Sequence, residues 1–205
     1  MHKAAAAIFS SFALTACSYE APTDISPSYD VYSNYDNKLN LNAALYVDAD
    51  EMEKNVKPSG IACSAHTYPV NAEKAFETSV FKTFENLVRR VELVEKPLDR
   101  QQMRARGYNA MLIVEAEDLD VDFKVVPGFW TSEVEADAEI TARLTADTRA
   151  GRALGTTVEG DEEATSESGA ACEGGATAVG EAVEAAIEET MARLGERLSN
   201  STRLR

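Results

Sequence analysis

Side chains that could support nucleophilic catalysis are scarce in this chain. It has two histidines, and His2 lies in the N-terminal segment, so a Ser-His-Asp or Cys-His arrangement would need His66 as its sole base. Cys63 lies close enough in sequence for a thiol–imidazole pair, although a polar histidine in a loop is the commoner case. A zinc site would lack nitrogen and sulfur ligands. We therefore expect no enzymatic activity, no cofactor and no dedicated metal centre.

Acidic side chains alternate with apolar ones in two segments. The acids are Asp118, Asp120, Asp122, Glu133, Glu135 and Asp137. A period of two predicts strands with one buried face and one wet face. The spacing of the first three acids also suggests an EF-hand loop. However, Phe123 and Phe129 stand where that loop needs Gly and Glu, so we reject it.

The two acidic segments flank Pro127-Gly128 and should form a hairpin. The apolar residues have odd numbers in the first segment and even numbers in the second. They therefore lie on the same face of the hairpin only if each residue pairs with a partner whose number adds to its own to give an odd sum. A turn of two or four residues then places Asp122 opposite Glu133 or Glu135, and like charges across a ladder destabilise a sheet. Two interpretations stay open. The acidic face is either a solvated surface or a surface that receives a basic partner or weakly held Ca²⁺.

The turn of this hairpin carries Phe129 and Trp130, and Trp130 is the only tryptophan in the chain. Tryptophan suits both protein interfaces and bilayer interfaces. An alternative is that Trp130 folds back into the core. We include both aromatic residues with the acids above as candidate partner-binding residues.

The N-terminus predicts export. Lys3 precedes an apolar run, Ala4 to Ala13, which is too short to span a bilayer. The run leads to Leu14-Thr15-Ala16-Cys17, which resembles the lipobox of bacterial lipoproteins. That resemblance implies that residues 1–16 are a signal peptide and that Cys17 is lipidated. The alternative is an ordinary secretory signal. Ser18, in place of Asp, favours the outer membrane, with the domain facing the periplasm.

The remaining cysteines and the net charge fit an exported protein. Cys63 and Cys172 should pair in an oxidising compartment, with two free thiols as the alternative. A disulfide would close a loop of about 110 residues, which the chain-entropy model values at about 4–5 kcal/mol. The formal charge of −15 disfavours binding to nucleic acid or to anionic headgroups.

The pattern along the chain predicts one domain over 38–198, after a flexible tether over 17–37 and before a flexible tail over 199–205. The elements that we expect are a strand over 39–47, a loop over 48–69, a helix from a cap at Asn71 to about Arg90, a strand over 91–94, a helix over 97–106 stopped by Gly107, strands over 110–125, 134–144 and 154–158, a mobile loop over 159–175 and a helix over 176–198. A change in apolar parity predicts a β-bulge near Glu117. The expected fold is α+β, a mainly antiparallel sheet of about five strands with two amphipathic helices packed on one face.

This layout resembles the YajG-type outer-membrane lipoproteins. More loosely, it is similar to the N-terminal domain of TolB and to curli-secretion and lipopolysaccharide-assembly lipoproteins. The resemblance rests on the lipobox, the long helix, the stretch Arg104-Ala105-Arg106-Gly107-Tyr108 before an apolar strand, and the 147–158 hairpin ending in Glu159-Gly160. It implies a non-enzymatic scaffold or assembly factor, anchored to the membrane by its lipid, that binds another envelope protein. The alternative is a carrier of a hydrophobic ligand, such as lipid or a glycan fragment, held between the helices and the sheet. Oligomeric state is not predicted.

Overall fold

The computed structural model describes residues 19–20, 23–29, 38–128, 132–169 and 172–205. The elements, in chain order, are β1 (Tyr19–Glu20), β2 (Leu39–Asp48), β3 (Glu53–Val56), β4 (His66–Asn71), α1 (Glu73–Leu87), β5 (Val88–Leu93), α2 (Arg100–Arg106), β6 (Ala110–Val126), β7 (Glu133–Thr148), β8 (Gly151–Glu167) and α3 (Gly174–Ser199). The α+β class predicted from the sequence is confirmed.

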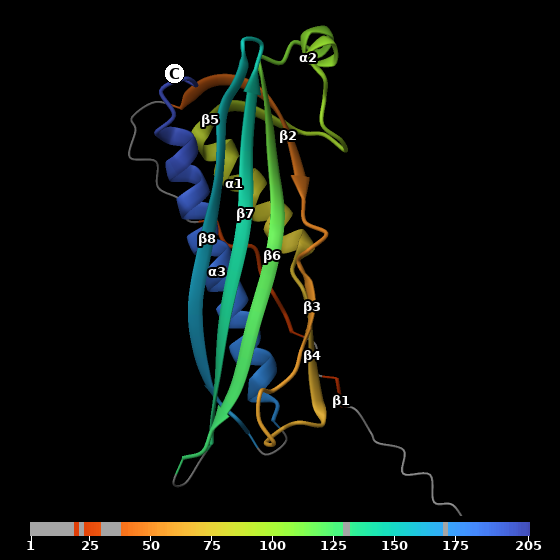
Figure 1. Cartoon of the computed structure of the whole chain (residues 1–205), viewed down its shortest axis with the longest axis vertical. Helices are drawn as coiled ribbons and strands as arrows, with labels where there is room; N and C mark the ends of the chain where they lie inside the picture. Colours follow the sequence, from red (N-terminus) through yellow and green to blue (C-terminus); the bar gives the residue numbers. More distant parts are fainter. Residues whose placement is uncertain (1–18, 21–22, 30–37, 129–131, 170–171) are drawn as a thin grey trace, which may run out of the picture.

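The main sheet has the strand order β5-β2-β6-β7-β8, and a smaller sheet has the order β1-β4-β3. Strand β2 runs parallel to β5 and β6, whereas β6, β7 and β8 form a long antiparallel meander. Figure 1 shows α1 and α3 side by side on one face of the main sheet, as predicted. The short helix α2 lies at one end of the sheet, where Met103 and Tyr108 pack with Ala44 and Met111.

The core between the sheet and the two long helices is filled by large apolar side chains. Those that are fully buried there include Leu45, Phe76, Phe84, Leu112, Phe123, Ile140, Leu144 and Ile187. In α1 the buried residues follow helical spacing, and in β6 and β7 every second residue points inward. The periodicity of the sequence thus sets which faces are buried.

Three local predictions in the region before and within α1 are wrong. Asn71 does not cap α1, since it ends β4 and its side-chain amide donates to the Glu53 carboxylate, while Ala72 takes the cap position. The predicted loop over 48–69 contains β3 and the start of β4. These strands escape sequence reasoning because they are short and mix Lys, Asn and Pro with apolar residues. In addition, α1 ends at Leu87 and leads directly into β5.

The helix stop and the bulge are confirmed. Helix α2 begins with a capping box between Asp99 and Gln102, and it ends at Gly107, whose φ of 80° is left-handed. The pairing of β6 with β7 shifts register between Ala116 and Asp118, as the change in apolar parity predicted.

The prediction of a mobile loop over 159–175 is wrong for most of its length. Strand β8 continues to Glu167 and pairs with β7 as far as Glu133. Gly160 explains how so polar a segment packs. A Cβ atom there would lie 2.3 Å from Thr190 Oγ1 and 2.6 Å from the Ala186 carbonyl oxygen, so α3 rests directly on the strand backbone. Tertiary packing therefore overrides the composition of the segment.

The predicted disulfide is present. Cys63 and Cys172 are joined with a Cα–Cα distance of 6.0 Å, across 109 positions of sequence. The bond ties the loop before β4 to the segment before α3. The Tyr68 hydroxyl donates to the Cys172 carbonyl oxygen at 2.8 Å, which holds the same two segments together.

The ends of the chain contact the domain where the structure describes them. In the predicted tether, the Thr23 hydroxyl donates to the Pro69 carbonyl oxygen at 2.8 Å, and the Ser28 amide donates to Ser79 Oγ at 3.0 Å. Ile25 packs against the core, and Leu204 in the predicted tail is buried. Cys17 lies outside the described residues, and within them no helix is both long and apolar enough to cross a membrane.

Close packing at Gly160 yields a prediction about stability. Gly160→Ala should lower the free energy of unfolding by about 1–3 kcal/mol, because α3 must move away from β8 to admit a methyl group. Gly155→Ala is the matched control in the same strand, since its Cβ would meet only the Arg152 side chain at 3.8 Å. Urea unfolding midpoints of the oxidised variants measure both effects, and equal midpoints would contradict the packing.

Candidate functional site

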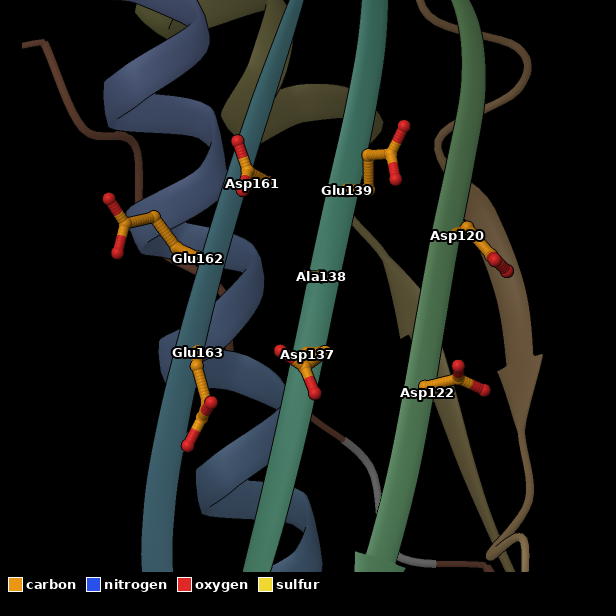
Figure 2. Close-up of a pocket in the computed structure, with 8 residues that line it drawn as sticks. All are labelled: Asp120, Asp122, Asp137, Ala138, Glu139, Asp161, Glu162 and Glu163. Atoms are coloured by element: carbon orange, nitrogen blue, oxygen red, sulfur yellow. The ribbon is translucent and has the colours of Figure 1, made fainter.

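The main sheet carries two rows of carboxylates on its solvent face. The first row is Asp122, Asp137 and Glu163, and the second is Asp120, Glu139 and Asp161. In each row the residues are direct partners across β6, β7 and β8. We call these six residues the acidic surface. Figure 2 shows their side chains, which together line a shallow depression of about 400 Å³.

The register of the hairpin differs from both predicted registers. The rule of odd sums holds, but the turn spans residues 127–132, so Asp122 faces Asp137 and not Glu133 or Glu135. Asp118 faces Thr141, and Glu135 faces Lys124. A longer turn shifts the pairing by two residues and leaves every side chain on its predicted face.

The candidate residues named from the sequence therefore fall into three groups. Asp120, Asp122 and Asp137 belong to the acidic surface. Asp118, Glu133 and Glu135 lie on the same face of the sheet but have no acid opposite them in the hairpin. Phe129, Trp130 and Cys17 lie outside the described residues.

Sequence reasoning missed the acids of β8. Glu139 lies within the strand predicted over 134–144, but Asp161 and Glu163 fell in the segment assigned to a loop. A second acidic group, Asp48, Asp50, Glu51, Glu115 and Glu117, surrounds Arg143 beside the bulge and was also missed. The alternation of Glu159, Asp161 and Glu163 was the available signal for the strand, but Gly160 and Glu162 between them gave no apolar side.

Among the described residues, ion pairs to the acidic surface occur at Asp120 and Asp161, and Lys124 beside it interacts with Asp137 and Glu163 through its charge alone. The Lys54 ammonium donates to Asp120, and this hydrogen bond together with its charge lowers the pKa of that carboxyl. Arg193 lies 3.6 Å from Asp161. Within the described part of the chain, no ion pair involves Asp122, Asp137, Glu139 or Glu163. The centre of the acidic surface thus keeps four carboxylates without a paired cation.

One group of carboxylates has the spacing of a possible cation site. The ligand atoms of Glu135, Asp137 and Glu163 lie within 4.8 Å of one another, and oxygen ligands suit Ca²⁺. Lys124 already pairs with Glu135, and the hydrogen bond between them raises the lysine pKa. Its ammonium group would compete with a metal ion. Calcium binding stays a prediction, and the location of Asp118 to Asp122 within β6 agrees with the rejection of an EF-hand.

The thiol–imidazole pair considered from the sequence does not form. Cys63 is bonded to Cys172, so its sulfur is not a thiolate nucleophile. His66 begins β4, and its ring stacks on that of Tyr68 with a centroid distance of 6.3 Å. The absence of enzymatic activity remains an expectation.

Comparisons with known proteins assign neither a family nor a function. No family model matches the chain, and no curated protein matches it. A DUF330-family protein from Xanthomonas campestris is 12% identical, with a TM-score of 0.48 over 90% of this chain and 95% of that one. A putative neuraminyllactose-binding hemagglutinin homolog from Helicobacter pylori is 10% identical, with a TM-score of 0.46 over 85% and 92%. A minor lipoprotein from Acinetobacter baumannii is 9% identical, with a TM-score of 0.33 over 78% and 90%.

Neutralising one central carboxylate should stabilise the domain. Asp137 faces Asp122 on one side and Glu163 on the other, so Asp137→Asn removes repulsion and should raise the free energy of unfolding by about 0.2–1 kcal/mol at low salt. Glu135→Gln is the control two residues away. This change removes the ion-pair partner of Lys124 and should not raise the free energy of unfolding. Urea unfolding at low and high salt measures both, because salt screens the effect at Asp137. A gain at Asp137 that is unchanged by salt would contradict the electrostatic cause.

Proposed function

We propose that this protein is a non-enzymatic lipoprotein of the bacterial envelope that binds another envelope protein through its acidic surface. The observation that carries this proposal is the pair of carboxylate rows across three strands, in which Asp120 and Asp161 alone have ion-pair partners among the described residues. A rigid sheet fixes the two rows about 7 Å apart along the strands and their members about 5 Å apart across them.

A basic partner would relieve a cost that this surface carries in isolation. Like charges that face each other across a ladder are unfavourable, and lysine or arginine side chains of a partner would convert that repulsion into attraction. A concentration of one sign of charge also raises the rate at which an oppositely charged protein arrives. The partner expected for this surface is therefore a protein with a basic patch or a basic extended segment.

The location in the envelope is supported by the N-terminal sequence. A lipid on Cys17 would hold the protein at a membrane, and the pathway that attaches it supplies two or three acyl chains, enough for stable anchoring. The disulfide between Cys63 and Cys172 agrees with an oxidising compartment. Attachment to the outer membrane, with the domain in the periplasm, is the location that we propose.

The alternative function, transport of a hydrophobic ligand, receives no support from the interior. The space between the two long helices and the sheet is occupied by fully buried side chains, among them Phe76, Phe84 and Phe123. A carrier would need an apolar cavity at this place.

Binding through the acidic surface can be tested with the full-length lipoprotein. The variant Asp122→Asn/Asp137→Asn/Glu163→Gln should recover its cross-linked partner from membranes at least about tenfold less well, since hydrogen bonds to charged groups contribute about 1.5–3 kcal/mol each. Mass spectrometry of the cross-linked products measures the recovery.

The control for this experiment removes the same number of charges elsewhere. Asp50→Asn/Glu51→Gln/Glu77→Gln changes three exposed acids outside the acidic surface. Its recovery of the partner should match that of the unchanged protein. Equal recovery by both triple variants would refute the role of the acidic surface.

A further inference from the structure

The chain enters the domain at one defined end. Strand β1 pairs with β4 in parallel, with Tyr19 opposite His66 and Glu20 opposite Thr67. Because β4 runs from the disulfide loop toward α1, the chain that precedes Tyr19 arrives at the disulfide end. His66 lies only three positions after Cys63.

This pairing limits how far the lipid can lie from the domain. Cys17 precedes Tyr19 by two residues, and an extended residue spans at most about 3.6 Å, so the two Cα atoms are at most about 7 Å apart. A lipid on Cys17 would therefore be attached next to the disulfide end of the domain. The described residues of the predicted tether, 19–20 and 23–29, lie against the domain.

Three segments meet at this same end. The Ser59 amide donates to the Phe123 carbonyl oxygen at 2.8 Å, which places the loop after β3 beside the end of β6. The Ser168 amide donates to the Ser132 carbonyl oxygen at 2.9 Å, which joins the segment before α3 to the β6–β7 turn. The disulfide connects the first segment to the third.

These three segments carry few charges in a chain where 27% of residues are charged, with Lys57 and Glu173 only at their borders. Residues 58–65, 125–132 and 168–172 contain no Asp, Glu, Lys or Arg. Ile61 is 95% exposed and Val126 is 39% exposed. A single exposed apolar residue is ordinary on a protein surface. Here, however, the exposed residues occupy the disulfide end, from which the anchored chain emerges.

We propose that this end of the domain, with Ile61 foremost, rests on the bilayer that holds the lipid of Cys17. The inference rests on the lipid anchor of the proposed function. The uncharged stretch around Ile61 presents no acidic side chain of its own to anionic headgroups, and an isoleucine side chain gains free energy on entering the boundary between headgroups and acyl chains. The occupant of this surface is thus a lipid surface and not a second protein.

The opposite end of the molecule offers the competing orientation. Helix α2 carries Arg100, Arg104 and Arg106, and its Arg100 side chain lies beside Gly151 at the start of β8. The β7–β8 turn carries Arg149, and Arg152 follows in β8; anionic headgroups attract such arginines. The two ends are about 50 Å apart, since β7 spans the distance with about 3.3 Å per residue. A probe at each end can therefore distinguish the two orientations.

The experiment uses the full-length lipidated chain with its only tryptophan replaced, Trp130→Phe. A single new tryptophan is then placed at one end, by Ile61→Trp, or at the other, by Ala150→Trp. The proteins are reconstituted in vesicles of phosphatidylethanolamine and phosphatidylglycerol whose acyl chains carry bromine, which quenches nearby tryptophan. Ile61→Trp should lose most of its emission, and Ala150→Trp should lose almost none. Ser64→Trp gives a second probe on the disulfide loop, and Ile61, Ser64 and Ala150 are all exposed, so each new tryptophan should leave folding intact.

The possible failures are distinguishable. Mass spectrometry that finds no lipid on Cys17 would overturn the anchor in the proposed function and this inference with it. A lipid on Cys17 with unquenched Ile61→Trp and Ser64→Trp would overturn the bilayer contact alone. Quenching at Ala150→Trp in place of Ile61→Trp would show that the arginine-rich end lies on the membrane, which also overturns it.

Discussion

The packing of α3 against the apolar face of the β6–β7–β8 meander determines where the acids lie. Side chains alternate along a strand, so burial of Phe123, Ala136 and Ile140 against the helices forces Asp122 and Asp137 onto the opposite face. A slip of one residue would bury every one of these acids. Full burial of a large apolar side chain contributes about 1.5–3 kcal/mol, whereas a repulsive cross-strand pair costs about 0.2–1 kcal/mol. Burial therefore prevails and holds like charges opposite one another.

Elements that show a local apolar period were predicted from the sequence, whereas elements that are held by contacts distant in sequence were missed. The apolar alternation of β6 and β7, the bulge near Glu117 and the stripe of α1 are local patterns, and the structure reproduces them. Strand β8 beyond Val158 has Gly160, Glu162, Ala164 and Ser166 on the side toward α3, so it lacks the pattern of a half-buried strand. This part of β8 is held in place by its hydrogen bonds to β7 and by the close packing of α3 against Gly160.

The candidate site was predictable in part for the same reason. Parity alone places Asp120, Asp122 and Asp137 on one face, but the register depends on the length of the turn, and Pro127-Gly128 suggested a shorter turn than the one present. The chain before β2 was assigned to a tether because it is polar. It binds the domain through hydrogen bonds of Thr23 and Ser28, which composition does not reveal.

The molecule has a distinct chemical character along its length. One end carries the disulfide and few charged residues, the middle of the sheet presents the acidic surface, and the other end is rich in arginine. In the arrangement that we propose, the anchor fixes the disulfide end at the bilayer. The acidic surface then faces sideways along the membrane, where an envelope partner can reach it.

The extension of β8 is the claim on which the acidic surface depends, because it brings Asp161 and Glu163 beside Glu139 and Asp137. Amide hydrogen exchange of residues 159–167, followed by NMR, tests it directly. If β8 pairs with β7 as described, the amides that donate to β7 should exchange as slowly as those of neighbouring strands. Exchange of the whole segment at the rate of an unfolded chain would contradict the account.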